Sequence, residues 1–478
     1  MLLEHQTLIC DFVFAIPDAI DLASPMLNSH HKKVAYISGC IAKEAGLPSD
    51  EVQDVVLASM LHDIGAFSID ERIEEHIDER IDERIGEYWG ERKSSNRSRH
   101  ALLGYELLRG FKPLAKAAYL IKHHHADHHS PDGDVPVGSS IIHLADRVAL
   151  LIDEKKEIFS QVQEIVDTIG NIKNIDNSNA PHPETLEAID RLSKLEYFWI
   201  EAALPPEHND LMRIVPRLRE SIDMGTLKDF ARAFAQIIDF RSRFTAAHSS
   251  GVATVAKELA MLSGFSEQEQ HMMEIAGLLH DVGKLAVPNE IIEKNGSLSA
   301  SELNCVKKHA YYTYAIVSKI RCLEHIAPYA AHHHERLDGN GYPFHVKGRD
   351  FSKLSRIMAV SDMFSALMED RPYRDRMKRE QAATLLINLA KSGGIDQTIM
   401  ELLLSNFQEV NDARLDAQHK AQKKYDSFCK AIANGESYHA GESYPAQSAP
   451  ERQLSIKSLT NVNPRRKIYT FGLSRSQQ

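Results

Sequence analysis

Residues 279–283 of this chain read Leu-His-Asp-Val-Gly, and residues 61–65 read Leu-His-Asp-Ile-Gly. Each stretch lies inside a longer series of histidines and aspartates, and the two series share their internal spacing. A histidine precedes the His-Asp pair by 32 residues in both series (30 to 62 and 248 to 280), and a later histidine precedes a His-His pair by 24 (100 to 124 and 309 to 333). Shared spacing of this kind indicates that one structural unit was duplicated within the chain.

The duplicated unit carries imidazole and carboxylate groups, which are the usual ligands of transition-metal sites. Seven such donors are many for one ion, whereas two ions that share a carboxylate would use them all. Asp63 and Asp281 are the natural bridges, because each directly follows a candidate ligand. A pair of ions suits phosphoryl transfer, since it holds the attacking and leaving oxygens. The candidate ligands are His30, His62, Asp63, His100, His124, His125 and Asp146 in the first series, and His248, His280, Asp281, His309, His333, His334 and Asp362 in the second.

Composition is that of a globular protein with two or three domains, at 478 residues, 43% hydrophobic and 26% charged. The net charge of −11 argues against a binder of nucleic-acid polymers, because no broad basic field would attract them. Five cysteines without a C-x-x-C pair suggest a reducing compartment. Asp11 and Asp18 interrupt the first apolar stretch, which argues against a signal peptide or membrane span. We therefore expect a cytoplasmic protein.

Helical periodicity runs through nearly the whole sequence. Apolar residues recur at helix spacing ahead of the second His-Asp pair, and residues 299–302, Ser-Ala-Ser-Glu, are a capping box that begins the helix of His309. Alternating strand patterns are nearly absent. We predict an all-α fold with two tandem helical domains at 1–155 and 236–412, joined by a helical connector at 156–235. A tail at 413–478, rich in Ser, Gly, Pro, Gln and basic residues, is predicted to be disordered.

The second half of the chain, from about 238 to 376, resembles the HD-GYP domain, a subgroup of the HD metal-dependent phosphohydrolases. The resemblance lies in residues 280–284 (His-Asp-Val-Gly-Lys), residues 333–343 (His-His-Glu-Arg-Leu-Asp-Gly-Asn-Gly-Tyr-Pro), Asp362 and residues 371–374 (Arg-Pro-Tyr-Arg). It implies a helical bundle with a di-iron or di-manganese centre that hydrolyses cyclic dinucleotides. It assigns the second series as metal ligands and places Lys284 at the scissile phosphate. The loop that shapes the substrate mouth would contain Gly341, Tyr342 and Pro343.

The chemistry of the residues near the predicted site agrees with the roles that the resemblance implies. Arg371 and Arg374 could pair with the second phosphate of the substrate, although a surface salt bridge is the alternative for both. Tyr342 could stack on a guanine or only stiffen its loop. The resemblance implies that some members of the family hold a third metal ion with a glutamate four residues before the first histidine. Here that position is Phe244, which cannot bind a cation. We therefore expect two ions, with iron or manganese favoured over magnesium by the histidine-rich ligand set.

The first half resembles a diverged HD domain. It keeps every candidate ligand but has Ala66 at the position of Lys284, and it lacks a Gly-Tyr-Pro loop. We expect a regulatory or structural domain that binds up to two further ions. A second phosphohydrolase site, such as a nucleotidase that trims the linear product, is the alternative.

The function expected for the whole chain is a cyclic di-GMP phosphodiesterase, with 3′,3′-cyclic GMP-AMP as the second candidate substrate. A different class of function is a signalling adaptor that binds the dinucleotide or partner proteins without turnover. The complete ligand set, Lys284 and the Gly-Tyr-Pro loop favour the enzyme. The oligomeric state is left open by the sequence.

Overall fold

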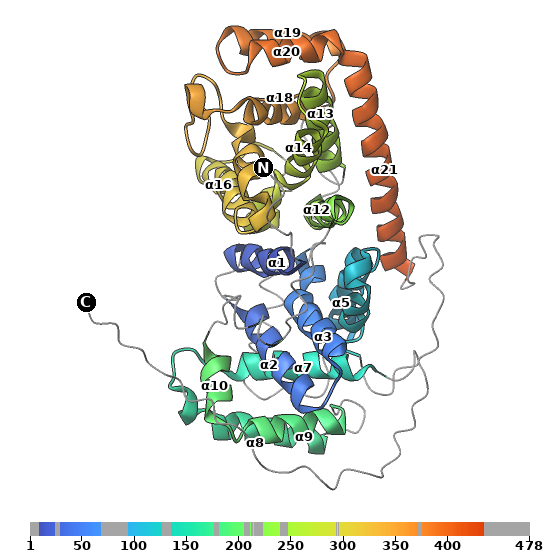
Figure 1. Cartoon of the computed structure of the whole chain (residues 1–478), viewed down its shortest axis with the longest axis vertical. Coiled ribbons are helices and arrows are strands. Elements are labelled where there is room, and N and C mark those ends of the chain that lie inside the picture. Colours follow the sequence, from blue (N-terminus) through green and yellow to red (C-terminus); the bar gives the residue numbers. More distant parts are fainter. Residues whose placement is uncertain are drawn as a thin grey trace, which may run out of the picture. The chain divides into compact units, whose positions relative to one another are not determined.

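The computed structural model describes the chain in segments. These are residues 9–23, 29–67, 94–126, 135–175, 181–204, 211, 214, 223–239, 247–292, 294, 296–370 and 375–434. Every regular element in these segments is an α-helix or a 3-10 helix (Figure 1). The predicted all-α class is therefore confirmed for the described part of the chain.

The first domain is a helical bundle built around α2 and α3. Helix α2 packs against α3 and α7, while α5 packs against α6 and the short η2 turn. Its elements are α1 (Ile9–Ala23), α2 (His30–Glu44), α3 (Ser49–Leu61), η2 (Ile64–Phe67), α5 (Ser94–Leu108), η3 (Lys112–Leu114), α6 (Ala115–Lys122) and α7 (Val137–Leu151).

Helices also fill the described part of the predicted connector. Helix α9 packs against α2 and α7, so it extends the first bundle. The elements of this region are η4 (Ile158–Ser160), α8 (Val162–Ile175), α9 (Pro183–Leu192) and α10 (Glu196–Ala203).

The second domain repeats the first bundle and adds helices at its C-terminal end. Helix α13 packs against α14, α18 and the long α21, which runs beside it (Figure 1). The elements are α12 (Met224–Asp239), α13 (His248–Leu262), α14 (Glu267–Leu279), η6 (Val282–Ala286), α15 (Asn289–Ile292), α16 (Ala300–Val317), η7 (Arg321–Ile326), α17 (Ala327–Ala331), η8 (His332–His334), η9 (Gly348–Asp350), α18 (Lys353–Leu367), α19 (Arg379–Lys391), α20 (Gln397–Ser405) and α21 (Phe407–Asn434).

The duplication is visible in the order of the helices. Helices α2, α3, α5 and α7 of the first domain correspond to α13, α14, α16 and α18 of the second, and η2 corresponds to η6. The match also includes α1 and α12, because Phe12 and Phe230 both lie 18 residues before the first histidine of their series (12 to 30 and 230 to 248). These two equivalent rings stack on each other with centroids 4.8 Å apart, inside one compact unit that covers residues 1–438.

One local prediction is confirmed and one boundary is wrong. Ser299 and Glu302 form the predicted capping box, since each side chain hydrogen-bonds the backbone of the other residue. The disordered tail was placed from residue 413, but α21 continues as a helix to Asn434. Its buried side chains include Val410 and Phe428, although the segment as a whole is polar, which is why its composition suggests disorder. Residues 435–478 lie outside the described residues.

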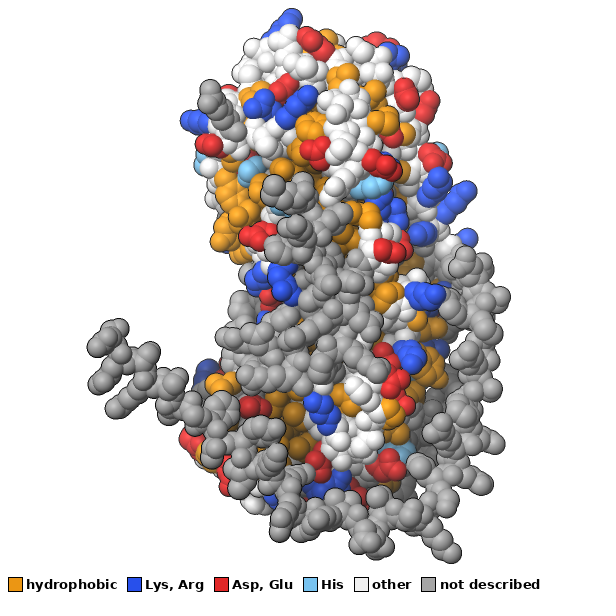
Figure 2. Space-filling model, viewed as in Figure 1, with side chains coloured by type: hydrophobic (Ala, Val, Ile, Leu, Met, Phe, Trp, Pro, Cys, Tyr) orange, Lys and Arg blue, Asp and Glu red, His pale blue; other side chains and the backbone are white. Residues whose placement is uncertain are grey.

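Charged side chains of both signs lie on the face of the molecule drawn in Figure 2. Among the described residues visible there, basic and acidic side chains are interspersed. None of the described helices combines the length and the apolar character that crossing a bilayer requires.

A glycine directly after each His-Asp-x stretch lets two backbones meet. A Cβ at Gly283 would lie 2.0 Å from the carbonyl oxygen of His309, and a Cβ at Gly65 would lie 2.1 Å from that of His100. Real Cβ atoms do not approach backbone oxygens this closely, so the turn after the His-Asp pair would have to move. The glycine therefore fixes how closely η6 approaches α16, and η2 approaches α5.

We predict that Gly283→Ala and Gly65→Ala each destabilise their own domain by about 1–3 kcal/mol or more, the usual cost of overpacking. Thermal unfolding followed by circular dichroism should show a lower midpoint for both variants. Gly110→Ala is the matched control, because a Cβ there meets no atom within 4 Å. Equal midpoints for all three variants would contradict this account of the backbone contact.

Candidate metal centres

Five elements bring the second series of predicted ligands together. His248 is the first residue of α13, and His280 and Asp281 lie in the turn between α14 and η6. His309 lies on α16, His333 and His334 form η8, and Asp362 lies on α18. The ligand atoms form two groups, each within 4.8 Å internally: His248 with His280 and Asp281, and His309 with His333 and His334. Six of the seven predicted ligands thus meet at one place, and Asp362 joins them beside His248.

Asp281 lies between the two groups. Its Oδ2 is 3.3 Å from His280 Nε2, and its Oδ1 is 3.4 Å from His309 Nε2. Asp362 lies opposite, with Oδ1 at 3.3 Å from His248 Nε2 and Oδ2 at 3.8 Å from His334 Nδ1. Asp281 thus directs one carboxylate oxygen toward each group of histidines, which is the geometry expected of a ligand that bridges two metal ions.

Hydrogen bonds on the outer side of the rings orient three of these histidines. Nδ1 of His280, His309 and His333 lies 2.7, 2.5 and 2.7 Å from the carbonyl oxygens of Gly277, Val306 and Ala330, each three residues earlier. A carbonyl oxygen only accepts, so each Nδ1 must carry the proton. Each neutral ring therefore directs the lone pair of Nε2 into the site, as a metal ligand requires.

The donor set fits a cation. The Nε2 atoms of His309 and His333 lie only 3.0 Å apart, with both Nδ1 protons already committed to carbonyl oxygens. Two buried lone pairs that face each other are unfavourable unless a cation or proton lies between them. Burial lowers the pKa of His309 to about 3, so a divalent ion satisfies this pair better than a proton. Neutral imidazole is also the form that binds metal.

The carboxylates of the site are ionised. Burial raises the pKa of Asp281, but His280 and Lys284 oppose this effect and bring it well below the usual value. The same competition, with His248 and His334 as the main opposing groups, lowers the pKa of Asp362. Two ionised aspartates among neutral histidines match the ligand preferences of iron and manganese.

Lys284 and the Gly-Tyr-Pro loop border the site. Lys284 Nζ donates a 2.6 Å hydrogen bond to Asp281 Oδ2. The Tyr342 ring lies 4.8 Å from the His334 ring, and its backbone N–H donates to the His334 carbonyl. A Cβ at Gly341 would lie 2.5 Å from the backbone of Glu335, so only glycine fits there. The loop is thus held directly against a candidate ligand, with Pro343 half-buried beside it. Arg371 and Arg374, predicted to contact substrate, lie outside the described residues.

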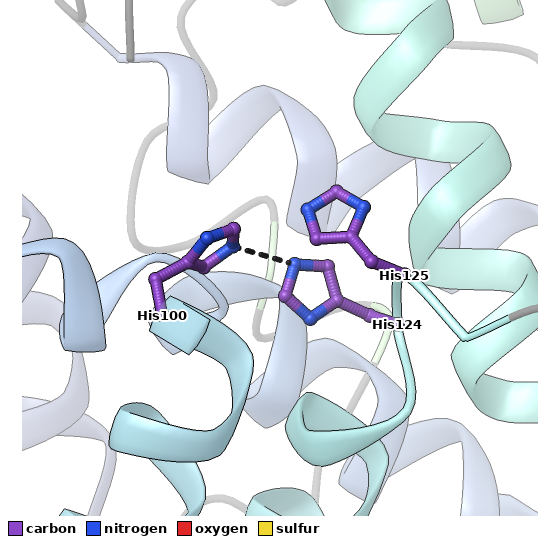
Figure 3. Close-up of side chains that lie close together, drawn as sticks. All are labelled: His100, His124 and His125. Atoms are coloured by element: carbon purple, nitrogen blue, oxygen red, sulfur yellow. Dashed lines mark hydrogen bonds between the residues drawn. The ribbon is translucent and has the colours of Figure 1, made fainter. Parts of the chain in front are cut away.

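The first series also converges. Asp63 has Oδ2 at 3.1 Å from His62 Nε2 and Oδ1 at 3.6 Å from His100 Nε2, and Asp146 Oδ1 lies 2.9 Å from His30 Nε2. Figure 3 shows His100 from α5 and His124 from the end of α6 directing ring nitrogens toward each other, 3.4 Å apart, with His125 beside them. Ala66 is buried where the second domain has Lys284. The first domain thus repeats the arrangement of donors without the lysine.

Sequence reasoning missed three side chains around these sites. His31 is fully buried, with Nε2 at 3.6 Å from Asp63 Oδ2, and its position in the second series is a serine, Ser249. Buried Glu335 accepts hydrogen bonds from the backbone N–H groups of three loop residues, 344 to 346. Glu369 lies 2.9 Å from His248 Nδ1. None lies at a shared spacing, so the duplication gave no signal for them.

Comparison with known proteins agrees with the duplication. A family model described as "HD domain" matches residues 28–151, and a second with the same description matches residues 232–399. The chain is 26% identical over 414 residues to the 3′3′-cGAMP-specific phosphodiesterase 1 of Vibrio cholerae, covering 83% of this chain and 91% of that protein.

Other relatives match mainly one half of the chain. The 3′3′-cGAMP-specific phosphodiesterase 2 of V. cholerae is 36% identical over 228 residues, which are 47% of this chain and 42% of that protein. The cyclic di-GMP phosphodiesterase response regulator RpfG of Xanthomonas campestris is 36% identical over 169 residues, covering 35% and 44%.

Among solved structures, a cyclic GMP-AMP specific phosphodiesterase of V. cholerae aligns over 84% of this chain and 98% of its own, with a TM-score of 0.57 and 22% identity. This likeness shows a shared fold. The chain therefore carries two HD domains in tandem, and its likeness to these relatives supports a metal-dependent phosphohydrolase.

Proposed function

We propose that the second domain is a metal-dependent phosphodiesterase that hydrolyses a cyclic dinucleotide, with 3′,3′-cyclic GMP-AMP as the preferred substrate. The observation that carries the proposal is the convergence of seven donors, six of them buried, around Asp281, beside Lys284 and the loop of Tyr342. Sequence reasoning ranked cyclic di-GMP first. A V. cholerae relative that aligns over 83% of the chain is named for cyclic GMP-AMP, which supports the reverse order, with cyclic di-GMP as the second candidate.

Each group near the site has a distinct role in this proposal. Two divalent ions, iron or manganese, would lower the pKa of a bound water and offset charge on the phosphate. Lys284 neutralises the non-bridging oxygens as negative charge develops on them. Tyr342 offers a ring against which a base can stack, and its contact with His334 fixes the distance from that base to the reacting phosphate. Water adds across one phosphodiester bond, which opens the ring and leaves a linear dinucleotide.

We propose that the first domain binds metal in a regulatory or structural role. Its donors converge like those of the second domain, but Ala66 offers no charge to a phosphate. The buried His31 adds another imidazole beside Asp63, and a site filled by protein ligands leaves less room for substrate. A nucleotidase that trims the linear product is the second candidate for this domain.

The function is tested by incubating the metal-loaded full-length protein with 3′,3′-cyclic GMP-AMP and with cyclic di-GMP, and separating the products by chromatography. We expect cleavage of both rings with a higher kcat/KM for cyclic GMP-AMP. The variant His280→Ala/Asp281→Ala should lose cleavage of both and keep its helical circular-dichroism signal, because these residues lie in a turn between helices. Binding of the dinucleotides without turnover by the parent protein would favour the adaptor.

Metal content provides an independent measurement. We expect elemental analysis of protein expressed with iron and manganese to find at least two transition-metal ions per chain, and up to four when the first domain is loaded. Chelation should abolish cleavage, since structural and catalytic ions are both lost. Activity that persists in protein without transition metal would refute the dinuclear site.

Lys284 is the clearest chemical difference between the domains. Its loss should affect the transition state more than bound substrate, because charge on the phosphate grows during the reaction. We expect Lys284→Ala to lower kcat by roughly 10²–10³, the scale for removing one charge-stabilising donor, with metal content unchanged.

Two control variants define this effect. Lys294→Ala removes an exposed lysine paired with Glu302 in the same domain and should retain full turnover. His62→Ala/Asp63→Ala should retain substantial cleavage of the cyclic substrate. A dead first-domain variant together with a fully active Lys284 variant would reverse the roles of the two domains.

A further inference from the structure

His248 differs from the other ligand histidines in what binds the outer side of its ring. Three of them place Nδ1 against the carbonyl oxygen three residues earlier, whereas His248 Nδ1 lies 2.9 Å from Glu369 Oε2. The reason is its position as the first residue of α13, so no turn of this helix precedes it to supply a carbonyl. The side-chain carboxylate of Glu369, two residues beyond the end of α18, takes that place.

The C-terminal helix α21 holds this carboxylate. Gln418 Nε2 donates a 2.5 Å hydrogen bond to Glu369 Oε1. Arg414, one turn earlier on α21, has Nη1 at 4.0 Å from the same oxygen and donates from Nη2 to the carbonyl of Met368. The Arg414 side chain is only 1% exposed, and an arginine buried this deeply requires an anionic partner. Glu369 therefore has one oxygen toward His248 and the other toward α21.

The second domain leaves space for this contact. A Cβ at Gly251 of α13 would lie 2.7 Å from Gln418 Nε2, so a larger residue there would displace the glutamine. The same position in the first series, three residues after its first histidine, is Lys33, which pairs with Glu154 instead. The close approach of α21 to α13 therefore depends on a glycine that the second domain has and the first domain lacks.

We propose that Glu369 is a positioning residue that sets the metal affinity of the second-domain centre through His248, and that Gln418 and Arg414 of α21 hold Glu369 in place for this role. The carboxylate accepts the Nδ1 proton, which fixes the tautomer, directs Nε2 toward Asp362, and makes the ring a stronger donor. The inference rests on the proposed metal centre but not on the identity of the substrate.

The test measures Mn²⁺ binding rather than turnover. Full-length protein that carries His62→Ala/Asp63→Ala, which silences the first-domain site, is freed of metal and dialysed against graded Mn²⁺, and bound metal is measured by elemental analysis. In this background we expect Glu369→Ala to weaken Mn²⁺ affinity by about 10–100-fold, the usual effect of removing such a partner. Glu369→Gln keeps an acceptor but loses the charge and should weaken it less. Gln418→Leu should also weaken it, because Glu369 loses a donor that orients it.

Controls separate positioning from stability. Glu409→Gln makes the same change at an exposed position of α21 and should bind Mn²⁺ like the parent. The thermal midpoint of metal-free Glu369→Ala should fall, because Arg414 loses its anionic partner, so the readout for positioning is the rise in midpoint that Mn²⁺ causes, which should shrink in each variant that weakens binding. Unchanged affinity in Glu369→Ala would overturn the proposal, and unchanged affinity in Gln418→Leu alone would overturn the role of α21. A parent that binds no Mn²⁺ would instead refute the proposed metal centre.

Discussion

The carboxylate of Asp281 is the interaction on which the candidate metal site of the second domain depends. Its two oxygens face different groups of histidines, and this arrangement requires α14, α16 and η8 to meet at one point. Gly283 allows that meeting, because η6 can then touch the backbone at His309. The cost of burying so many polar donors is offset when cations bind them, so the fold and the metal site stabilise each other.

The two domains show which parts of this arrangement belong to the fold and which belong to the chemistry. Both keep the aspartate between histidine groups and the glycine that follows the His-Asp-x stretch. They differ at two positions beside the donors. Lys284 of the second domain corresponds to Ala66 of the first, and Ser249 corresponds to the buried His31. Ser249 instead donates a hydrogen bond to the buried Asp239. The differences therefore concern access to the donors more than the donors themselves.

Sequence alone predicted which side chains converge, because their spacing is repeated and each repeat constrains the other. It predicted the helix of His309 because a capping box is a local signal. It could not find Glu369 or Glu335, since their partners are reached only through tertiary packing: one contacts the start of α13, the other three backbone N–H groups of a loop. The end of α21 was missed for the same reason, because its polar sequence is helical where packing against α13 supports it.

The contacts between the repeats explain why a domain without the lysine is part of this fold. Helix α1 packs against η6 and α16 of the second repeat, and α12 packs against η2 and α5 of the first. Phe230 of α12 stacks on Phe12 and also meets Phe111, with ring centroids 3.9 Å apart. Each turn that follows a His-Asp pair is thus covered by the first helix of the other repeat. The turn that bears Lys284 therefore owes part of its packing to α1 of the first domain, so the first domain contributes to the stability of the second site.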